Sequence, residues 1–289
     1  MIPLSRIFSK QLYRAGIVSV LANIIASCGG APTKPTEPAP SGERPSGFPS
    51  TIQRPEGEAA IPPTAAPSDI EAQQRYKDPA KHLIKLGRYL DAALLLSELA
   101  ATVGPPHRQE YQLQIASLLL QGNYLLQAEQ ILGEINVAGL DNSYHVRKTL
   151  LAAQLSLANQ QPEVAVSQLD SIAGVINGTS PQLQKDFYNK QIDAFYAKGD
   201  FAGSAMARHS VNKLISDNEQ IQENQEIILR DLQELPSSDL ASLTDQPSDA
   251  DMQGWIALAF IAKSAGDETQ AQQEIDKWME QYPDHPVSL

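Results

Sequence analysis

The chain is poor in cysteine, in aromatic residues and in positive charge. It has one cysteine among 289 residues and 6% aromatic residues, and its formal net charge is -12. Such an acidic balance argues against nucleic acid as a partner, because phosphate binding needs a basic surface. The apolar content of 42% is ordinary. The abundant Ala, Leu and Gln favour helices.

The sequence also lacks the motifs that carry most enzyme chemistry. It has no Gly-rich phosphate loop, no Gly-x-Ser-x-Gly elbow and no His-Glu-x-x-His metal motif. The five histidines do not lie at metal-ligand spacing, and we interpret them as surface or packing residues: His82, His107, His145, His209 and His285. We therefore predict no catalytic residue, no metal ligand and no cofactor, and we do not expect an enzyme.

Two acidic patterns are better explained by helix structure than by chemistry. Asp249 begins a stretch that resembles a calcium-binding loop, but Phe260 stands at its twelfth position, where a bidentate Glu is needed. We expect Ser248 or Asp249 to cap the helix that carries Trp255 instead. Nothing marks a catalytic pair among four further acids, which we assign to a solvated helix face: Glu98, Glu110, Glu129 and Glu134.

The N-terminus has the composition of a secretory signal. Three basic residues come first, at Arg6, Lys10 and Arg14, and a mostly apolar stretch runs from Ala15 to Ala26. At about a dozen residues this stretch is too short to span a bilayer, which needs ~20. Residues 1–27 are therefore predicted to be a signal peptide.

The segment Ile25-Ala26-Ser27-Cys28 resembles the lipobox of bacterial lipoproteins. The resemblance implies that Cys28 is diacylated, with fatty acids such as palmitate, and becomes the first residue of the mature chain. Because Gly29 follows it, and not Asp, lipoprotein sorting implies the periplasmic side of the outer membrane. The alternative is an ordinary signal peptide with a leftover or structural cysteine. A lipidated Cys28 would leave no thiol for a disulfide, a metal site or a nucleophile.

Residues 28–67 are predicted to be a lipidated cysteine followed by a disordered Pro-rich tether. Half of the chain's 20 prolines fall between Gly29 and Pro67, with almost no apolar pattern. Such a stretch buries too little surface to offset the entropy of ordering. As a random coil it would average ~35 Å, and ~120 Å if it were wholly polyproline II. We expect it to hold a folded body, residues 68–289, away from the membrane.

The folded body shows weak internal repeats of about 35 to 40 residues, a length typical of paired-helix repeats. A Gly-x-Tyr sequence recurs at 87–89 and 122–124, and looser copies surround Pro162 and Gly199. A further copy, nearest the C-terminus, fits the tetratricopeptide pattern best, at Trp255, Leu258, Gly266, Ala271 and Pro283. We predict an all-α fold, an irregular tetratricopeptide-like right-handed helical solenoid.

The repeats assign a role to two sets of small residues. Four glycines are predicted to end the first helix of each pair in a left-handed conformation: Gly87, Gly122, Gly199 and Gly266. Five alanines are predicted to lie where paired helices cross closely: Ala92, Ala128, Ala165, Ala205 and Ala271. An irregular insert from Lys213 to Asp249 should hold one long helix, Glu219 to Leu235, stopped by Pro236.

Aromatic residues have two readings. They could anchor a partner, since aromatic residues dominate the energetics of interfaces. We favour the other reading, in which each packs within the repeats: Trp255, Trp278, Tyr188, Tyr196, Phe195 and Phe201.

The ordered set of motifs resembles the N-terminal part of the LpoA family, outer-membrane lipoproteins of LppC type. The resemblance rests on 224–232 with Leu235-Pro236, on 254–259, and on 278–286. It implies a non-enzymatic regulator of peptidoglycan synthesis and cell shape that activates a class A penicillin-binding protein, with peptidoglycan as a second partner. In the family a two-lobed domain that contacts the synthase follows the helical domain and should begin near Leu289. We therefore expect this chain to lack that domain, as a split or truncated gene product or as a short relative.

Two other readings stay open. A generic helical-repeat lipoprotein could serve as a scaffold for outer-membrane assembly. An enzyme fragment, such as the solenoid of a lytic transglycosylase, would need a catalytic Glu on a separate domain.

Overall fold

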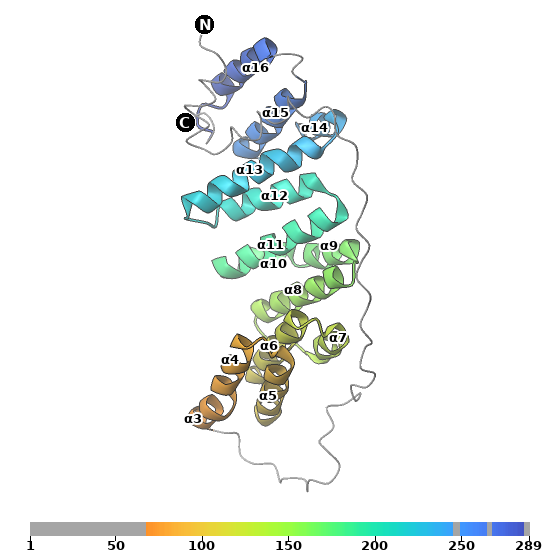
Figure 1. Cartoon of the computed structure of the whole chain (residues 1–289), viewed down its shortest axis with the longest axis vertical. Coiled ribbons are helices and arrows are strands. Elements are labelled where there is room, and N and C mark those ends of the chain that lie inside the picture. Colours follow the sequence, from red (N-terminus) through yellow and green to blue (C-terminus); the bar gives the residue numbers. More distant parts are fainter. Residues whose placement is uncertain (1–67, 245–248, 265–267, 286–289) are drawn as a thin grey trace. The chain divides into compact units, whose positions relative to one another are not determined.

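The computed structural model describes residues 68–244, 249–264 and 268–285, and no strand occurs among them (Figure 1). The elements are α3 (Asp69–Ala72), the π-helix η2 (Gln73–Lys77), α4 (Asp78–Lys85), α5 (Tyr89–Thr102), α6 (His107–Gln121), α7 (Leu125–Glu134), α8 (Asn142–Ala158), α9 (Pro162–Asp170), α10 (Ala173–Ile176), α11 (Pro181–Lys198), α12 (Phe201–Asn212), α13 (Asn218–Glu234), α14 (Ser237–Thr244), α15 (Ala250–Ser264) and α16 (Glu268–Gln281). The predicted signal, Cys28 and the predicted tether lie outside the described residues. The prediction of an all-α, tetratricopeptide-like fold is confirmed.

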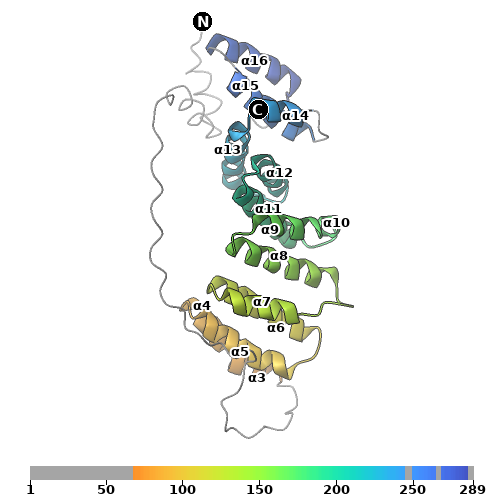
Figure 2. The same cartoon turned by 90° about the vertical axis from the view of Figure 1, so that its right-hand side faces the viewer.

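The described helices divide into two compact units, an N-terminal unit up to Val175 and a C-terminal unit from Ile176. Within each unit, helices that follow one another in the chain pack together, such as α5 on α6 in the first and α11 on α12 in the second (Figures 1 and 2). No single helix pair can bury its apolar face alone, so each unit gains its core by stacking pairs.

The turn between the two helices of a pair, which we call the joint, has the same backbone structure four times. Its central residue is left-handed at Gly87, Asn123, Gln160 and Gly199, with φ between 59° and 78°. In each joint the next residue donates its N–H to a carbonyl five residues back, as from Arg88 to Leu83 at 2.9 Å and from Asp200 to Phe195 at 2.8 Å. The left-handed residue donates to a carbonyl three residues back. Together these bonds form a Schellman motif, which satisfies the last carbonyls of the first helix.

The prediction of a left-handed conformation is wrong for one of the four glycines. Gly122 has φ -82°, and the following Asn123 takes the left-handed conformation at φ 60°. Gly122 has a steric role instead, because a Cβ there would lie 2.7 Å from ring carbons of Tyr124. The Gly-x-Tyr repeat is therefore offset by one residue from the structural repeat. Gly87 and Gly199 are confirmed as left-handed, and Gly266 lies outside the described residues.

The close-packing position lies five residues after each left-handed residue. Ala92, Ala128 and Ala165 occupy it in three joints, and all are fully buried, as predicted. In the fourth joint this position is Ser204, also fully buried, and not the predicted Ala205. Ala205 is buried in the core around Trp255, while the side chain of Ala271 lies outside the described residues. A hydroxyl thus stands where the other joints have a methyl group.

The predicted long helix and the predicted cap are both found. Helix α13 begins one residue before Glu219 and ends one residue before Leu235. Asp249 accepts a hydrogen bond from the backbone N–H of Met252 at 3.0 Å and so caps α15. Ser248 lies outside the described residues.

Candidate functional site

The hydroxyl of Ser204, in the fourth joint, contacts the buried carboxylate of Asp231. Ser204 on α12 donates to Oδ2 of Asp231 on α13 at 2.8 Å, and Asp231 is 3% exposed. Arg208, one turn further along α12, lies with Nε 3.4 Å from the same oxygen, and its Nη1 reaches Asn224. A buried charge costs several kcal/mol unless it is paired and hydrogen-bonded. This centre therefore ties α12 to α13 in one register.

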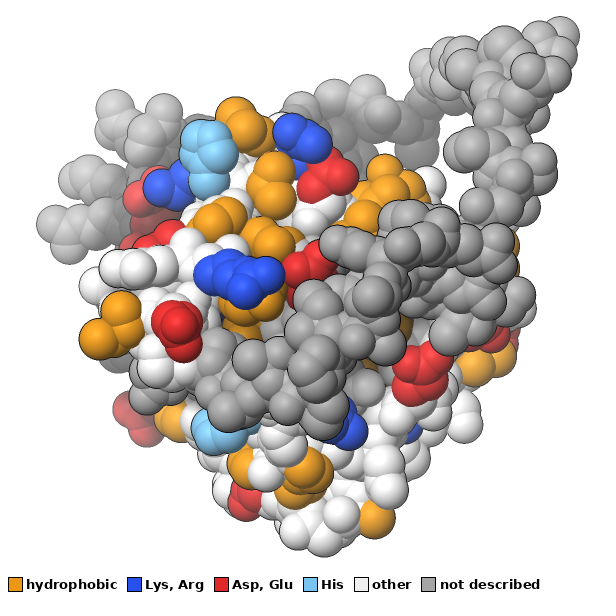
Figure 3. All heavy atoms as spheres, turned by 90° about the horizontal axis from the view of Figure 1, so that it is seen from below, with side chains coloured by type: hydrophobic (Ala, Val, Ile, Leu, Met, Phe, Trp, Pro, Cys, Tyr) orange, Lys and Arg blue, Asp and Glu red, His pale blue; other side chains and the backbone are white. Residues whose placement is uncertain are grey.

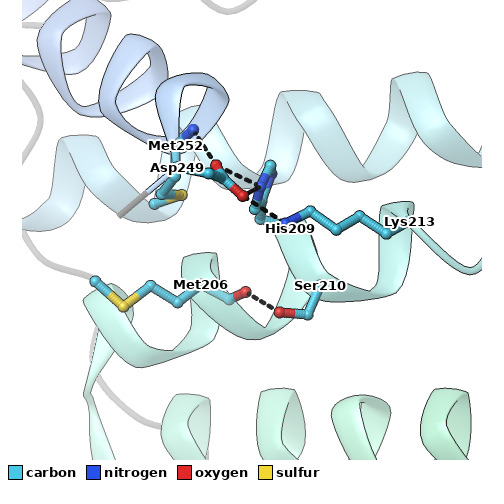
Figure 4. A network of polar contacts seen from close by, with 6 residues as sticks. All are labelled: Met206, His209, Ser210, Lys213, Asp249 and Met252. Atoms are coloured by element: carbon cyan, nitrogen blue, oxygen red, sulfur yellow. Dashed lines mark hydrogen bonds and ion pairs between the residues drawn. The ribbon is translucent and has the colours of Figure 1, made fainter. Parts of the chain in front are cut away.

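A second polar centre joins α12 to the start of α15 (Figure 4). Asp249 lies 2.9 Å from Nε2 of His209 and also pairs with Nζ of Lys213. Burial opposes the charge of this carboxylate, but the bonds from Lys213, from the Met252 backbone and from His209 outweigh it and hold the pKa of Asp249 well below its usual range. One carboxylate thus caps α15 and fixes it to α12.

Beyond this centre, three rings close the described end of the C-terminal unit. Trp255 and Trp278 are 1% and 2% exposed, and His285 packs edge-on against both. Nε1 of Trp278 donates to the carbonyl of Gly254 at 2.9 Å. The prediction that both tryptophans pack within the repeats is confirmed.

In the N-terminal unit one ion pair crosses between helices of successive pairs. Arg147 on α8 makes a two-pronged contact with the carboxylate of Glu110 on α6, and one of its bonds is 2.9 Å long. This hydrogen bonding outweighs partial burial and lowers the pKa of Glu110. The prediction that Glu110 belongs to a solvated helix face is therefore wrong. The other three acids of that set are exposed, as predicted: Glu98, Glu129 and Glu134.

Each joint also displays one large apolar side chain to solvent. Leu86, Leu126, Val164 and Tyr196 are 59%, 70%, 44% and 58% exposed. Tyr196 packs edge-on against Phe201. Among the aromatic residues that we predicted to pack within the repeats, it is the most exposed to solvent. Hydrophobic side chains also lie between charged ones on the face drawn in Figure 3. These side chains lie at different positions of their joints: Leu86 and Tyr196 precede the left-handed residue, whereas Leu126 and Val164 follow it. Each is a candidate contact point within its own unit.

The described residues offer little else. No group of three or more His, Cys, Asp or Glu within 68–244, 249–264 and 268–285 could hold a metal ion. In the same ranges, no helix combines the length and the apolar character that crossing a bilayer requires. Cys28, the one predicted modification site, lies outside them. Sequence reasoning missed Ser204, Asp231 and Arg147, because their partners lie on other helices and no local pattern marks them.

These features define an all-α helical-repeat protein whose polar centres link helices. A family model described as "LppC putative lipoprotein" matches residues 89–289, and the chain belongs to this family.

Two curated relatives carry the name "Penicillin-binding protein activator LpoA". The protein from Glaesserella parasuis is 25% identical over 183 residues, which is 63% of this chain and 31% of the relative. The protein from Vibrio cholerae is 26% identical over 165 residues, 56% of this chain and 27% of the relative. The chain thus spans between a quarter and a third of the length of these relatives.

A solved structure shows the same fold. The amino-terminal domain of LpoA from E. coli aligns with a TM-score of 0.51 and 19% identity, over 68% of this chain and 86% of that domain. At this identity the likeness concerns the fold alone.

Proposed function

We propose that this chain is the helical part of a cell-envelope lipoprotein that activates a penicillin-binding protein. The observation that carries the proposal is the family match over 89–289, together with relatives named as penicillin-binding protein activators. The partner we propose is a class A synthase, which polymerises and cross-links peptidoglycan. The chain would act by binding, without a reaction of its own.

We place the protein at the periplasmic face of the outer membrane, anchored through lipidated Cys28. Each buried methylene contributes ~0.8 kcal/mol, so several acyl chains on one cysteine hold the protein stably. Residues 29–67 would then let the helical body reach peptidoglycan and the synthase. Cys28→Ser should move the protein from the outer-membrane fraction to the soluble fraction. Unchanged fractionation would defeat the anchor.

We assign partner binding to the exposed apolar side chains of the joints. Leu126 is 70% exposed, so Leu126→Ser should change stability by less than about 0.5 kcal/mol. Ile70 is 69% exposed but lies on α3, away from any joint, and provides a matched control. Leu126→Ser should weaken cross-linking to the synthase, while Ile70→Ser should not.

The activity test adds the purified chain to a class A penicillin-binding protein and measures the rate of glycan polymerisation and peptide cross-linking. Stimulation supports the proposal. Binding without stimulation would restrict the chain to positioning the synthase. Co-purification with barrel-assembly proteins, and not with the synthase, would favour the scaffold for outer-membrane assembly.

A further inference from the structure

The three-ring cluster at the end of the C-terminal unit contains an ionisable ring. His285 is 2% exposed, and its centroid lies 4.6 Å from that of Trp255 and 4.9 Å from that of Trp278. Both contacts are edge-on, which is an arrangement that aromatic pairs favour. His285 follows α16 by only a few residues, so its packing holds the end of α16 against α15.

The backbone of α15 is shaped for this ring. Gly254 lies beneath it, and a Cβ at that position would come within 2.6 Å of the His285 ring. The carbonyl of the same glycine accepts the bond from Trp278. A charged His285 ring in this cluster loses most of the water that would solvate its charge in an open state, and this loss costs free energy.

The charged groups around His285 do not offset that loss. Asp251 on α15 favours the charged ring through its carboxylate and through a backbone hydrogen bond, whereas His209 on α12 opposes it. Burial is the largest effect, and it lowers the pKa of His285 from 6.5 to about 4. The ring is therefore neutral in the packed state near pH 7.

We propose that α16, with residues 282–285, is an acid-released segment: protonation of His285 opens the three-ring cluster and frees α16 from α15, while α11 to α13 stay folded. Among the described helices α16 packs chiefly on α15, and this single contact supports local release. The proposal does not depend on the function of the protein.

The size of the effect follows from linkage. Because the folded pKa is depressed, the open state binds the proton first, and packing weakens as the pH falls below 6.5. Between pH 6.5 and 4 each pH unit lowers the ratio of packed to released α16 about tenfold, about 300-fold in all.

The chain carries its own reporter, since its two tryptophans are both in this cluster. Tryptophan emission of the full chain should shift to longer wavelength between pH 6 and 4, while most helical circular dichroism is retained. His285→Phe keeps an aromatic ring that cannot titrate and should abolish the shift. His82→Phe changes an exposed histidine in the N-terminal unit in the same way, and should leave the shift unchanged.

Two results would overturn the proposal. One is a shift that survives in His285→Phe at the same pH. The other is a shift that coincides with loss of the whole helical signal. If His285→Phe does not fold, hydrogen exchange of the unchanged protein decides. After correction for the intrinsic rate, α16 should lose protection at pH 4.5 while α12 keeps it, and equal protection of the two helices would refute local release.

Discussion

Ser204→Ala should destabilise the C-terminal unit, although it gives the fourth joint the same residue as the other three. The hydroxyl donates to a carboxylate that is 3% exposed, across 2.8 Å. A hydrogen bond to a charged group contributes about 1.5–3 kcal/mol. Alanine returns about 0.5 kcal/mol through its higher helix propensity. The net loss should be about 1–2.5 kcal/mol.

Ser210→Ala is the matched control. Ser210 lies on the same helix, but its hydroxyl bonds back to the carbonyl of Met206, one turn earlier. Such a bond adds little to helix stability. This substitution should therefore be neutral or slightly stabilising.

A double-mutant cycle with Asp231→Asn tests the contact itself. Asp231→Asn removes the charge and leaves an acceptor, so it weakens the contacts of both Ser204 and Arg208. Groups in one network couple by about 0.5–3 kcal/mol. The double variant with Ser204→Ala should thus lose less stability than the two single variants together.

The assay is urea unfolding followed by tryptophan emission at pH 7.5. Both tryptophans lie in the C-terminal unit, so the signal reports that unit even if the two units unfold separately. If Ser204→Ala and Ser210→Ala behave alike, or if the cycle is additive within about 0.5 kcal/mol, the buried centre does not stabilise the joint.

Three further predictions concern the N-terminal unit. Each is tested by thermal unfolding measured with circular dichroism. Gln160→Gly should stabilise it by about 1 kcal/mol, because glutamine pays a steric cost at φ 59° that glycine avoids; an unchanged midpoint would contradict strain at this joint. Gly122→Ala should destabilise it despite an ordinary φ, because the methyl group meets the Tyr124 ring, and a neutral result would mean that the ring moves aside. The pairing with Arg147 lowers the pKa of Glu110, so its stabilisation is present above about pH 4.3 and is lost as the pH falls. Glu110→Gln should therefore lose up to about 1 kcal/mol at pH 7 and differ less from the parent at pH 3; an equal difference at both pH values would rule out the ion pair as its cause.

The sequence was sufficient to predict the repeats, because glycine and alanine mark positions with a local cause. Gly87 and Gly199 end helices, and Ala92 lies at a close crossing, as predicted. The pattern failed where another residue type meets the same backbone requirement. Asn123 and Gln160 are left-handed because the hydrogen bonds of the joint impose that conformation. The residue type at these two positions did not lead us to predict it.

The polar centres were harder to foresee for a different reason. Ser204 and Asp231 are 27 residues apart, and Glu110 and Arg147 are 37 apart. Their pairing depends on how neighbouring helices are placed, which follows from packing and not from any short motif. Asp249 shows the intermediate case, since its cap on α15 is local and was predicted, while its contacts with His209 and Lys213 were not.

The shared backbone geometry of the joints indicates where such a chain can change its length. The left-handed residues at 87, 123, 160 and 199 are separated by 36, 37 and 39 positions, yet the two bonds of each Schellman motif keep the same spacing throughout. The number of residues between joints therefore varies, while the turn at each joint keeps its geometry. Grafts of an epitope or a protease site should accordingly be accepted at the exposed residues 138 and 139 between α7 and α8, and rejected at the left-handed residues of the joints.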